Sequence, residues 1–85
     1  MYMLAYTEEA RACLQEMPKE RRQDCVAALI RLAADPYAQP STPVVRGKEE
    51  TNRMVPIADR VMAHYAVDDR GLLLVTVIDI YDGTV

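Results

Sequence analysis

The spacing of apolar residues changes once along the chain, and this change constrains the fold more than any other feature of the sequence. It occurs at residues 36–43, Pro-Tyr-Ala-Gln-Pro-Ser-Thr-Pro, which contain three of the five prolines and are predicted to form an extended loop. Before this segment apolar residues recur every three or four positions, as in an amphipathic helix; after it they alternate, as in a strand with one buried face. The sequence therefore predicts helices in the first half and a sheet in the second.

The helical half contains two helices behind a short strand. Residues 2–6 are apolar and aromatic and are predicted to be that strand. Thr7 can cap the first helix, and the two glutamates after it place negative charge where the helix dipole favours it. Pro18 separates the two helices, and Pro36 ends the second because the residue before a proline disfavours helical backbone angles.

Three strands are predicted after the loop, at residues 53–57, 60–67 and 72–80. Pro56 cannot donate a ladder hydrogen bond, which indicates an edge or a bulge, and residues 68–71 form a hairpin turn. The last strand, nearly all apolar or β-branched, is expected to be central and buried on both sides. The order β-α-α-β-β-β predicts an α+β fold in which a helical hairpin covers one face of a small antiparallel sheet and leaves the other face open.

Length and charge narrow the classes of protein. At 85 residues the chain forms a single domain, residues 1–85, that buries roughly 60% of its unfolded surface. The formal charge of −3 argues against a general nucleic-acid-binding protein. The charge is uneven, however: residues 36–63 carry +1, whereas residues 64–85 carry one arginine and four aspartates.

Metal, cofactor and membrane signals are weak. His64 is the only histidine, and Cys13 and Cys25 lie apart on apolar helix positions, so no metal site and no cofactor are predicted and both thiols are expected to be buried and reduced. No signal peptide is predicted from the first residues, and no apolar run is long enough to span a membrane. A cytoplasmic location is therefore expected.

A series of short segments together resembles a known family. They are Tyr-x-x-x-Tyr followed by Thr-Glu-Glu-Ala, then Leu-x-x-Met-Pro, Leu-Ala-Ala-Asp-Pro, Val-Val-Arg-Gly, an arginine-led strand with a tyrosine, an acidic turn, and Leu-Val-Thr-Val-Ile-Asp-Ile. In this order the chain resembles the RelE/ParE superfamily of bacterial toxins from type II toxin–antitoxin modules, which include plasmid-stabilisation proteins. The resemblance implies the fold above, a cognate antitoxin bound across the sheet, and either ribosome-dependent cleavage of mRNA or inhibition of DNA gyrase.

The resemblance also assigns candidate site residues. Cleavage by attack of a ribose 2′-hydroxyl on the adjacent phosphate needs a base, an acid and cations near the phosphate oxygens. The resemblance implies that Arg60 and Arg53 stabilise charge on the phosphate. It also implies that Arg46 or Lys48, near the loop, binds RNA.

Two further residues are candidates for proton transfer. His64 follows Arg60 at i+4, about 13 Å along the same strand face, and its imidazole is a possible base or acid. Tyr81 can stand in for the family's terminal tyrosine. The alternative for His64 is a purely structural role, and Tyr65, which alternates with apolar residues, is expected in the core.

One departure from the family leaves three hypotheses open. Ribonucleases of the family continue into a basic segment after the last strand, whereas this chain is acidic there. The first hypothesis is a ribosome-dependent endoribonuclease that acts on mRNA and is neutralised by an antitoxin. The second is a toxin that only binds, because it is catalytically degenerate or inhibits gyrase. The third is a small dimeric interaction domain.

The expected partners follow from these hypotheses. They are an antitoxin and, for an active toxin, the ribosome and mRNA, in a homodimer or a toxin–antitoxin hetero-oligomer without membrane attachment. The open sheet face and a groove beside the helical hairpin are expected to offer apolar pockets flanked by arginine, suited to an amphipathic acidic segment that folds on binding.

Overall fold

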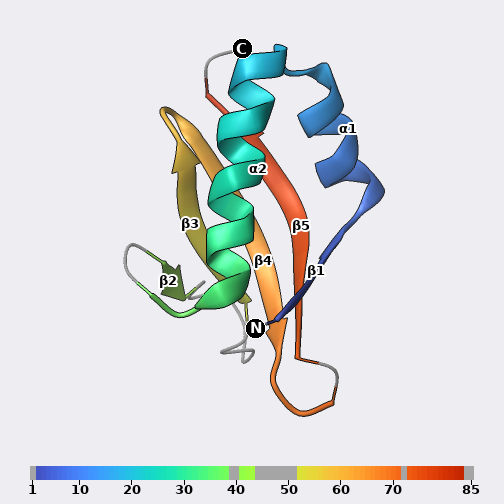
Figure 1. Ribbon diagram of the computed structural model, residues 1–85, viewed down its shortest axis with the longest axis vertical. Helices are drawn as coiled ribbons and strands as arrows, with labels where there is room; N and C mark the ends of the chain where they lie inside the picture. The colour runs from blue at the N-terminus through green and yellow to red at the C-terminus, as the bar shows by residue number, and fades with distance from the viewer. Residues whose placement is uncertain (1, 39–40, 44–51, 72, 84–85) are drawn as a thin grey trace.

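Two helices and five strands make up the fold (Figure 1), seen in a computed structural model that describes residues 2–38, 41–43, 52–71 and 73–83. In chain order the elements are β1 (Met3–Tyr6), α1 (Glu8–Glu16), α2 (Lys19–Ala34), β2 (Thr42–Pro43), β3 (Asn52–Ala58), β4 (Val61–Asp68) and β5 (Leu74–Asp82). The predicted α+β fold and its β-α-α-β-β-β order are confirmed, with the two-residue strand β2 as an addition. The Val-Val-Arg-Gly segment of the family resemblance, residues 44–47, lies outside the described residues.

The sheet is mixed rather than wholly antiparallel. Its strand order is β1-β5-β4-β3-β2, in which β3, β4 and β5 form an antiparallel meander. β1 pairs with β5 in parallel, with Met3 opposite Leu74 and Tyr6 opposite Val77. The parallel pair arises because the chain leaves β1 through both helices before it returns to the sheet, whereas hairpins join the later strands.

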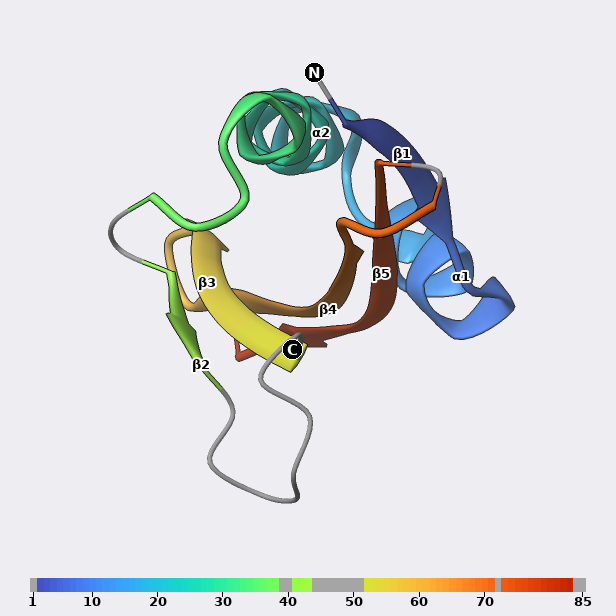
Figure 2. The ribbon, with the colours of Figure 1, turned by 90° about the horizontal axis from the view of Figure 1, so that it is seen from below.

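The helices begin and end at the predicted signals. Thr7 caps α1, and its hydroxyl accepts a hydrogen bond from the Ala10 amide at 3.2 Å. Pro18 lies at the junction and α2 ends at Ala34, one residue before Asp35. Side chains from both helices enter one core with a single face of the sheet. Figure 2 shows α2 on the concave side of the curve that β3, β4 and β5 make.

The core is built from small and branched side chains around one tyrosine. Its members from the helices are Ala10, Leu14, Cys25, Leu29 and Leu32, and those from the sheet are Val55, Ile57, Val61, Ala63, Tyr65, Val67, Val75, Val77 and Ile80, with Met17 at the helix junction. Tyr65 is fully buried, and its hydroxyl donates to the Pro36 carbonyl and contacts the Ser41 hydroxyl. The prediction that Tyr65 belongs to the core is confirmed.

β5 is an interior strand between β1 and β4, but the middle strand of the sheet is β4, and β5 is not buried on both sides as predicted. Val75, Val77 and Ile80 are buried against the helices, whereas Thr76 and Ile78 on the strand are only half-buried. The prediction failed because apolar composition alone does not show that a layer covers the second face.

Pro56 lies where an edge proline is expected. In the described residues β2 pairs with Arg53 and Met54, so Pro56 is beyond the last described β2 pair, and the β3–β4 register shifts between Pro56 and Ala58. Both the edge and the irregularity predicted from this proline are therefore confirmed.

The cysteines are free thiols, with Cys25 buried and Cys13 half-buried, so the expectation of burial holds fully for Cys25 alone. Burial raises the pKa of both thiols. Within the described residues, no helix is both long and apolar enough to cross a membrane.

Candidate active site

The face of the sheet turned away from the core is called here the open face. Cross-strand pairing across β3, β4 and β5 arranges nine of its residues in three rows: Asn52, Ala66 and Thr76; Met54, His64 and Asp79; Pro56, Met62 and Tyr81. Most of them are half-buried. Among the described elements, no helix lies over this side of β3 and β4 (Figure 2). The open face is therefore the surface of the sheet that can receive a ligand.

His64 occupies the centre of the open face. Met54 on β3 and Asp79 on β5 are its direct cross-strand neighbours. The His64 Nε2 atom is buried and has no hydrogen-bond partner among the described residues. A buried imidazole nitrogen without a partner is unusual, because most buried polar atoms are hydrogen-bonded.

Asp79 is a site residue that sequence reasoning missed. Simple alternation would put it on the same side as Val75 and Val77, in the core. The register of β4 and β5 shifts between His64 and Tyr65, so that Ile78 is an extra residue and Asp79 emerges on the open face. Only an acidic residue inside an otherwise apolar strand signalled that the alternation breaks here.

Tyr81 lies on the open face, as the catalytic assignment requires. It is opposite Met62, one row from His64 and Asp79, and is 51% exposed. Rows on one face are about 6.6 Å apart along a strand. The structure thus brings together His64, Asp79 and Tyr81.

Arg60 lies beside this group but not within the strand. It is exposed, occupies the turn between β3 and β4, and has a φ of 60°. The prediction that it shares a strand face with His64 is therefore wrong, because the turn ends the alternation before residue 61. Its guanidinium group has no partner among the described residues, and its carbonyl accepts a hydrogen bond from the Gly83 amide at 2.7 Å.

Gly83 allows this close approach. A Cβ atom at residue 83 would lie 3.0 Å from the Arg60 carbonyl oxygen, tighter than ordinary contacts. The turn is thereby held against the end of β5, next to Tyr81. Arg60 is therefore an exposed cation at the end of the sheet that carries Tyr81.

Arg53, predicted to stabilise phosphate charge, instead bonds to other residues of the fold. It pairs with Tyr65 and lies on the face that packs against α2. Its Nε donates to the Ser41 hydroxyl at 2.7 Å and its guanidinium to the Ser41 carbonyl at 3.2 Å, while the group stacks 5.1 Å from the centre of the Tyr37 ring. Arg53 and His64 are therefore on opposite faces, and this geometry does not support a phosphate contact by Arg53.

Two tyrosines connect the Arg53 cluster to the β4–β5 turn. The hydroxyls of Tyr2 and Tyr37 both donate to the Asp69 carboxylate, Tyr2 at 2.6 Å. The hydrogen bond to Asp69 raises the pKa of Tyr37 to about 12, and the two hydroxyls lower the pKa of Asp69. These bonds hold the segment after α2 to the far end of the sheet.

The acidic end of β5 also has a structural partner. Arg21 of α2 forms an ion pair with Asp82 at 3.0 Å and donates to the Asp59 carbonyl at 2.9 Å. The aspartate side chain is only 8% exposed. Part of the acidic character that distinguishes this end from the family pattern therefore serves to attach α2 to the sheet.

Arg46 and Lys48 lie outside the described residues, so their predicted RNA contacts stay predictions. The nine open-face residues include no lysine or arginine. Within the described part of the chain, no group of three or more His, Cys, Asp or Glu side chains could hold a metal ion.

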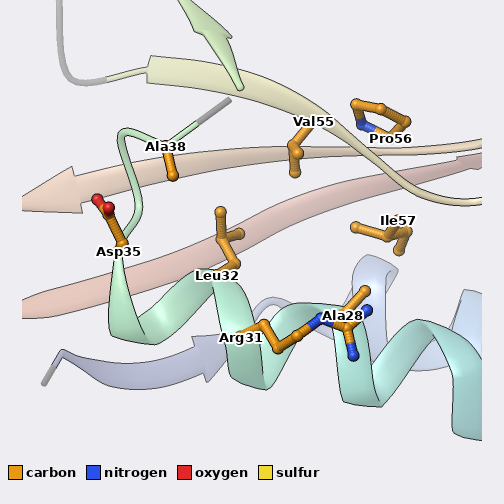
Figure 3. Close-up of a pocket in the computed structure, with 8 residues that line it drawn as sticks. All are labelled: Ala28, Arg31, Leu32, Asp35, Ala38, Val55, Pro56 and Ile57. Atoms are coloured by element: carbon orange, nitrogen blue, oxygen red, sulfur yellow. The ribbon is translucent and has the colours of Figure 1, made fainter. Parts of the chain in front are cut away.

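A hollow of about 300 Å³ lies at the edge of the sheet, between α2 and β3. Its lining is Ala28, Arg31, Leu32, Asp35, Ala38, Val55, Pro56 and Ile57. Figure 3 shows Leu32 and Val55 pointing toward each other across it. The hollow has the apolar lining and the flanking arginine expected of the groove beside the helical hairpin.

We compared the chain with protein families, curated sequences and solved structures. No protein-family model and no curated protein sequence matches the chain. The structure of the RelBE2 toxin–antitoxin complex from Mycobacterium tuberculosis is similar, with a TM-score of 0.78, 18% identity, and 95% of this chain and 96% of that chain covered. The chain has the RelE-like toxin fold.

Two other structures with the RelE-like fold support the same conclusion. The isolated RelE toxin of E. coli gives a TM-score of 0.77 at 18% identity, over 96% of this chain and 84% of that chain. The E. coli DinJ–YafQ toxin–antitoxin complex gives 0.69 at 12% identity, over 98% of this chain and 93% of that chain. In this chain, the open face of the RelE-like fold carries His64, Asp79 and Tyr81.

Proposed function

We propose that the protein is the toxin of a bacterial toxin–antitoxin module, a cytoplasmic, ribosome-dependent endoribonuclease that a cognate antitoxin neutralises. The observation that carries this proposal is the similarity of nearly the whole chain to toxins, two of them in complexes with antitoxins. Because identity is at most 18% in these comparisons, the activity has to be argued from the residues of the open face.

His64 is the proposed proton-transfer residue of the cleavage reaction. The base removes a proton from the ribose 2′-hydroxyl, the oxygen attacks the adjacent phosphorus, and the 5′-oxygen leaves with a proton from an acid. His64 can act as the base or the acid because the ordinary pKa of an imidazole lies near neutrality. Asp79 beside it can orient the ring and stabilise the imidazolium.

Tyr81 and Arg60 complete the proposed site from the end of the sheet. The Tyr81 ring is exposed one row from His64, where an unpaired base can stack on it. Arg60 is the proposed contact for the phosphate oxygens, since its guanidinium group is exposed and bidentate contacts suit phosphate. Arg46 and Lys48 are proposed as additional RNA contacts.

In vitro translation of a reporter mRNA, followed by primer extension, tests this function directly. We expect the wild-type protein to produce cleavage at ribosome-positioned sites, and His64→Gln and Arg60→Ala to slow cleavage at least ~100-fold each. Arg70→Ala is the matched control, because Arg70 is an exposed arginine in the turn at the opposite end of β4. Absence of cleavage by the wild-type protein, or equal cleavage by all three variants, would overturn the catalytic assignment.

A toxin that acts by binding alone is the second candidate, and one observation favours it. The open face lacks lysine and arginine in its nine described residues, and Arg53 is engaged with Ser41 and Tyr37. Growth arrest on induced expression, without mRNA cleavage in the extract and without relief by His64→Gln, would select this candidate.

The antitoxin is proposed to cover the hollow between α2 and β3 and part of the open face. Added burial of apolar surface on a domain of 85 residues stabilises it strongly, so we expect the protein encoded by the neighbouring gene to raise the melting temperature. No thermal shift on mixing the two purified proteins at micromolar concentration would contradict the proposed partnership.

A further inference from the structure

His64, whose Nε2 atom is buried, shares the open face with two methionines. Met54 lies directly opposite His64 on β3, and Met62 precedes it by two residues on the same face of β4. Asp79 in the row of His64, and Asn52 and Thr76 in the next row, are the polar residues nearest to it in the pairing register. The Nε2 atom nevertheless has no hydrogen-bond partner among the described residues. A buried imidazole nitrogen without a hydrogen-bond partner, on a face that also carries two methionines, calls for an explanation other than hydrogen bonding.

The spacing of these three side chains suits a shared ligand. Directly opposite residues such as Met54 and His64 have Cβ atoms about 5 Å apart, and the diagonal pair Met54 and Met62 is about 7 Å apart. Met62 and His64 are about 6.6 Å apart along the strand. Methionine side chains are long and flexible, so both sulfurs can reach the position in front of Nε2. All three residues are half-buried, which limits competition from water.

We propose that Met54, Met62 and His64 form a binding site for monovalent copper. Thioether sulfur is a soft, uncharged ligand that selects Cu(I), and a neutral imidazole nitrogen completes a three-coordinate N,S,S set. Calcium and magnesium require oxygen ligands, and protein zinc sites use thiolate, imidazole and carboxylate groups. The two thioethers therefore distinguish copper from the commoner divalent ions.

Asp79 acts on this site as a positioning residue. It is the cross-strand neighbour of His64 on the side away from Met54. A metal-bound histidine usually donates its second ring N–H to a carboxylate, which fixes the tautomer and makes the ligand more basic. Asp79 can accept that N–H from Nδ1, leaving Nε2 for the metal, and its charge balances the single positive charge of Cu(I).

The thiols of the helical layer are the competing ligands. Cys25 Sγ lies 3.7 Å from the Met17 Sδ atom in the core. Burial raises the pKa of Cys25, which disfavours the thiolate that binds metal. An experiment must nevertheless separate a Cys25–Met17 site from the open-face site.

Nuclear magnetic resonance separates them residue by residue. His64 is the only histidine and the chain has five methionines, so an untagged protein labelled with ¹⁵N and with ¹³C at the methionine methyls reports both sites. One equivalent of Cu(I), kept reduced with ascorbate under argon, is expected to shift the His64 ring nitrogens and the Met54 and Met62 methyls. The Met3 and Met17 methyls are expected to stay in place. Shifts confined to Met17 would overturn the proposal in favour of the thiol site.

Competition with a chromophoric Cu(I) chelator measures the affinity. Met54→Leu and Met62→Leu conserve side-chain volume, and each is expected to weaken binding at least ~10-fold, as is His64→Gln. Asp79→Asn is expected to weaken binding ~10-fold to ~100-fold and to change the His64 tautomer seen in ¹⁵N shifts. Met3→Leu is the control, because Met3 is 62% exposed on β1.

Failure of the wild-type protein to withdraw copper from the chelator would overturn the proposal, as would equal affinities in all variants. The measurement does not depend on the proposed cleavage, so a protein that leaves mRNA intact tests the copper site equally well.

Discussion

Replacing Arg53 by methionine separates a structural arginine from an RNA-binding one. If Arg53 is held by Ser41 and Tyr37, Arg53→Met destabilises the fold; if it is a surface phosphate contact, stability is unchanged. Methionine keeps most of the aliphatic volume, so the comparison concerns the guanidinium group.

The expected loss follows from the contacts. Two hydrogen bonds from the guanidinium, at 2.7 Å and 3.2 Å, contribute about 1 kcal/mol each once partial exposure is taken into account. The Tyr37 ring at 5.1 Å adds about 0.5–1 kcal/mol. A loss of about 2–3 kcal/mol is large for 85 residues, whose free energy of unfolding is expected to be about 4–13 kcal/mol.

Urea unfolding measured by far-ultraviolet circular dichroism and tyrosine fluorescence checks this. The midpoint is expected to fall by about 1–2 M with an unchanged slope. Arg53→Lys keeps the charge but not the planar fork of donors, so it is expected to lose about half as much. A double-mutant cycle with Ser41→Ala is expected to give a coupling of about 1 kcal/mol or more. If Arg53→Met matches the Arg70→Ala control within about 0.5 kcal/mol, the structural role is refuted.

Two further predictions concern backbone strain and pH. Arg60→Gly is expected to raise the free energy of unfolding by about 0.5–1 kcal/mol in the same urea assay, because a φ of 60° is strained for arginine but not for glycine. The same variant is expected to cleave mRNA more slowly. A loss of stability would show instead that the Arg60 side chain supports the turn. The pKa of Tyr37 is raised above its ordinary value of 10 to about 12, so the Tyr37–Asp69 bond contributes fully below pH 10 and is lost as pH rises toward 12. Stability measured between pH 9 and pH 12 is expected to fall less steeply in Tyr37→Phe than in the wild type, and identical slopes would show that the bond does not form.

Periodicity and end signals predicted most of the fold. Thr7, Pro18 and Asp35 mark helix ends by local chemistry, so the helices were predicted nearly to the residue. The alternation from residue 61 to residue 67 placed Tyr65 in the core and His64 on the open face. The parallel pairing of β1 with β5 was not predictable in this way, because it joins segments far apart in sequence.

The site was predicted less well, for three physical reasons. Asp79 reaches the open face through a bulge that reverses the alternation, and the only sequence signal of that bulge was the acidic residue itself. Arg60 lies in a turn with a φ of 60°, and arginine is not among the residues that turn preferences favour; Asp59 before it was the only turn signal. Arg53 did carry a signal, since it has the same parity as the buried residues Val55 and Ile57; that parity indicated the core face, and the family resemblance pointed the other way.

The pairing of β1 with β5 has a consequence for how this protein is made. Residues 3–6 acquire their strand partners only when residues 74–77 have been synthesised, so the sheet and the part of the core that Val75 and Val77 complete form late. Long-range contacts of this kind delay folding until the last strand has emerged. For the proposed toxin, cleavage is therefore expected only after residues 74–77 have paired with β1, because the open face is incomplete before β5 joins the sheet.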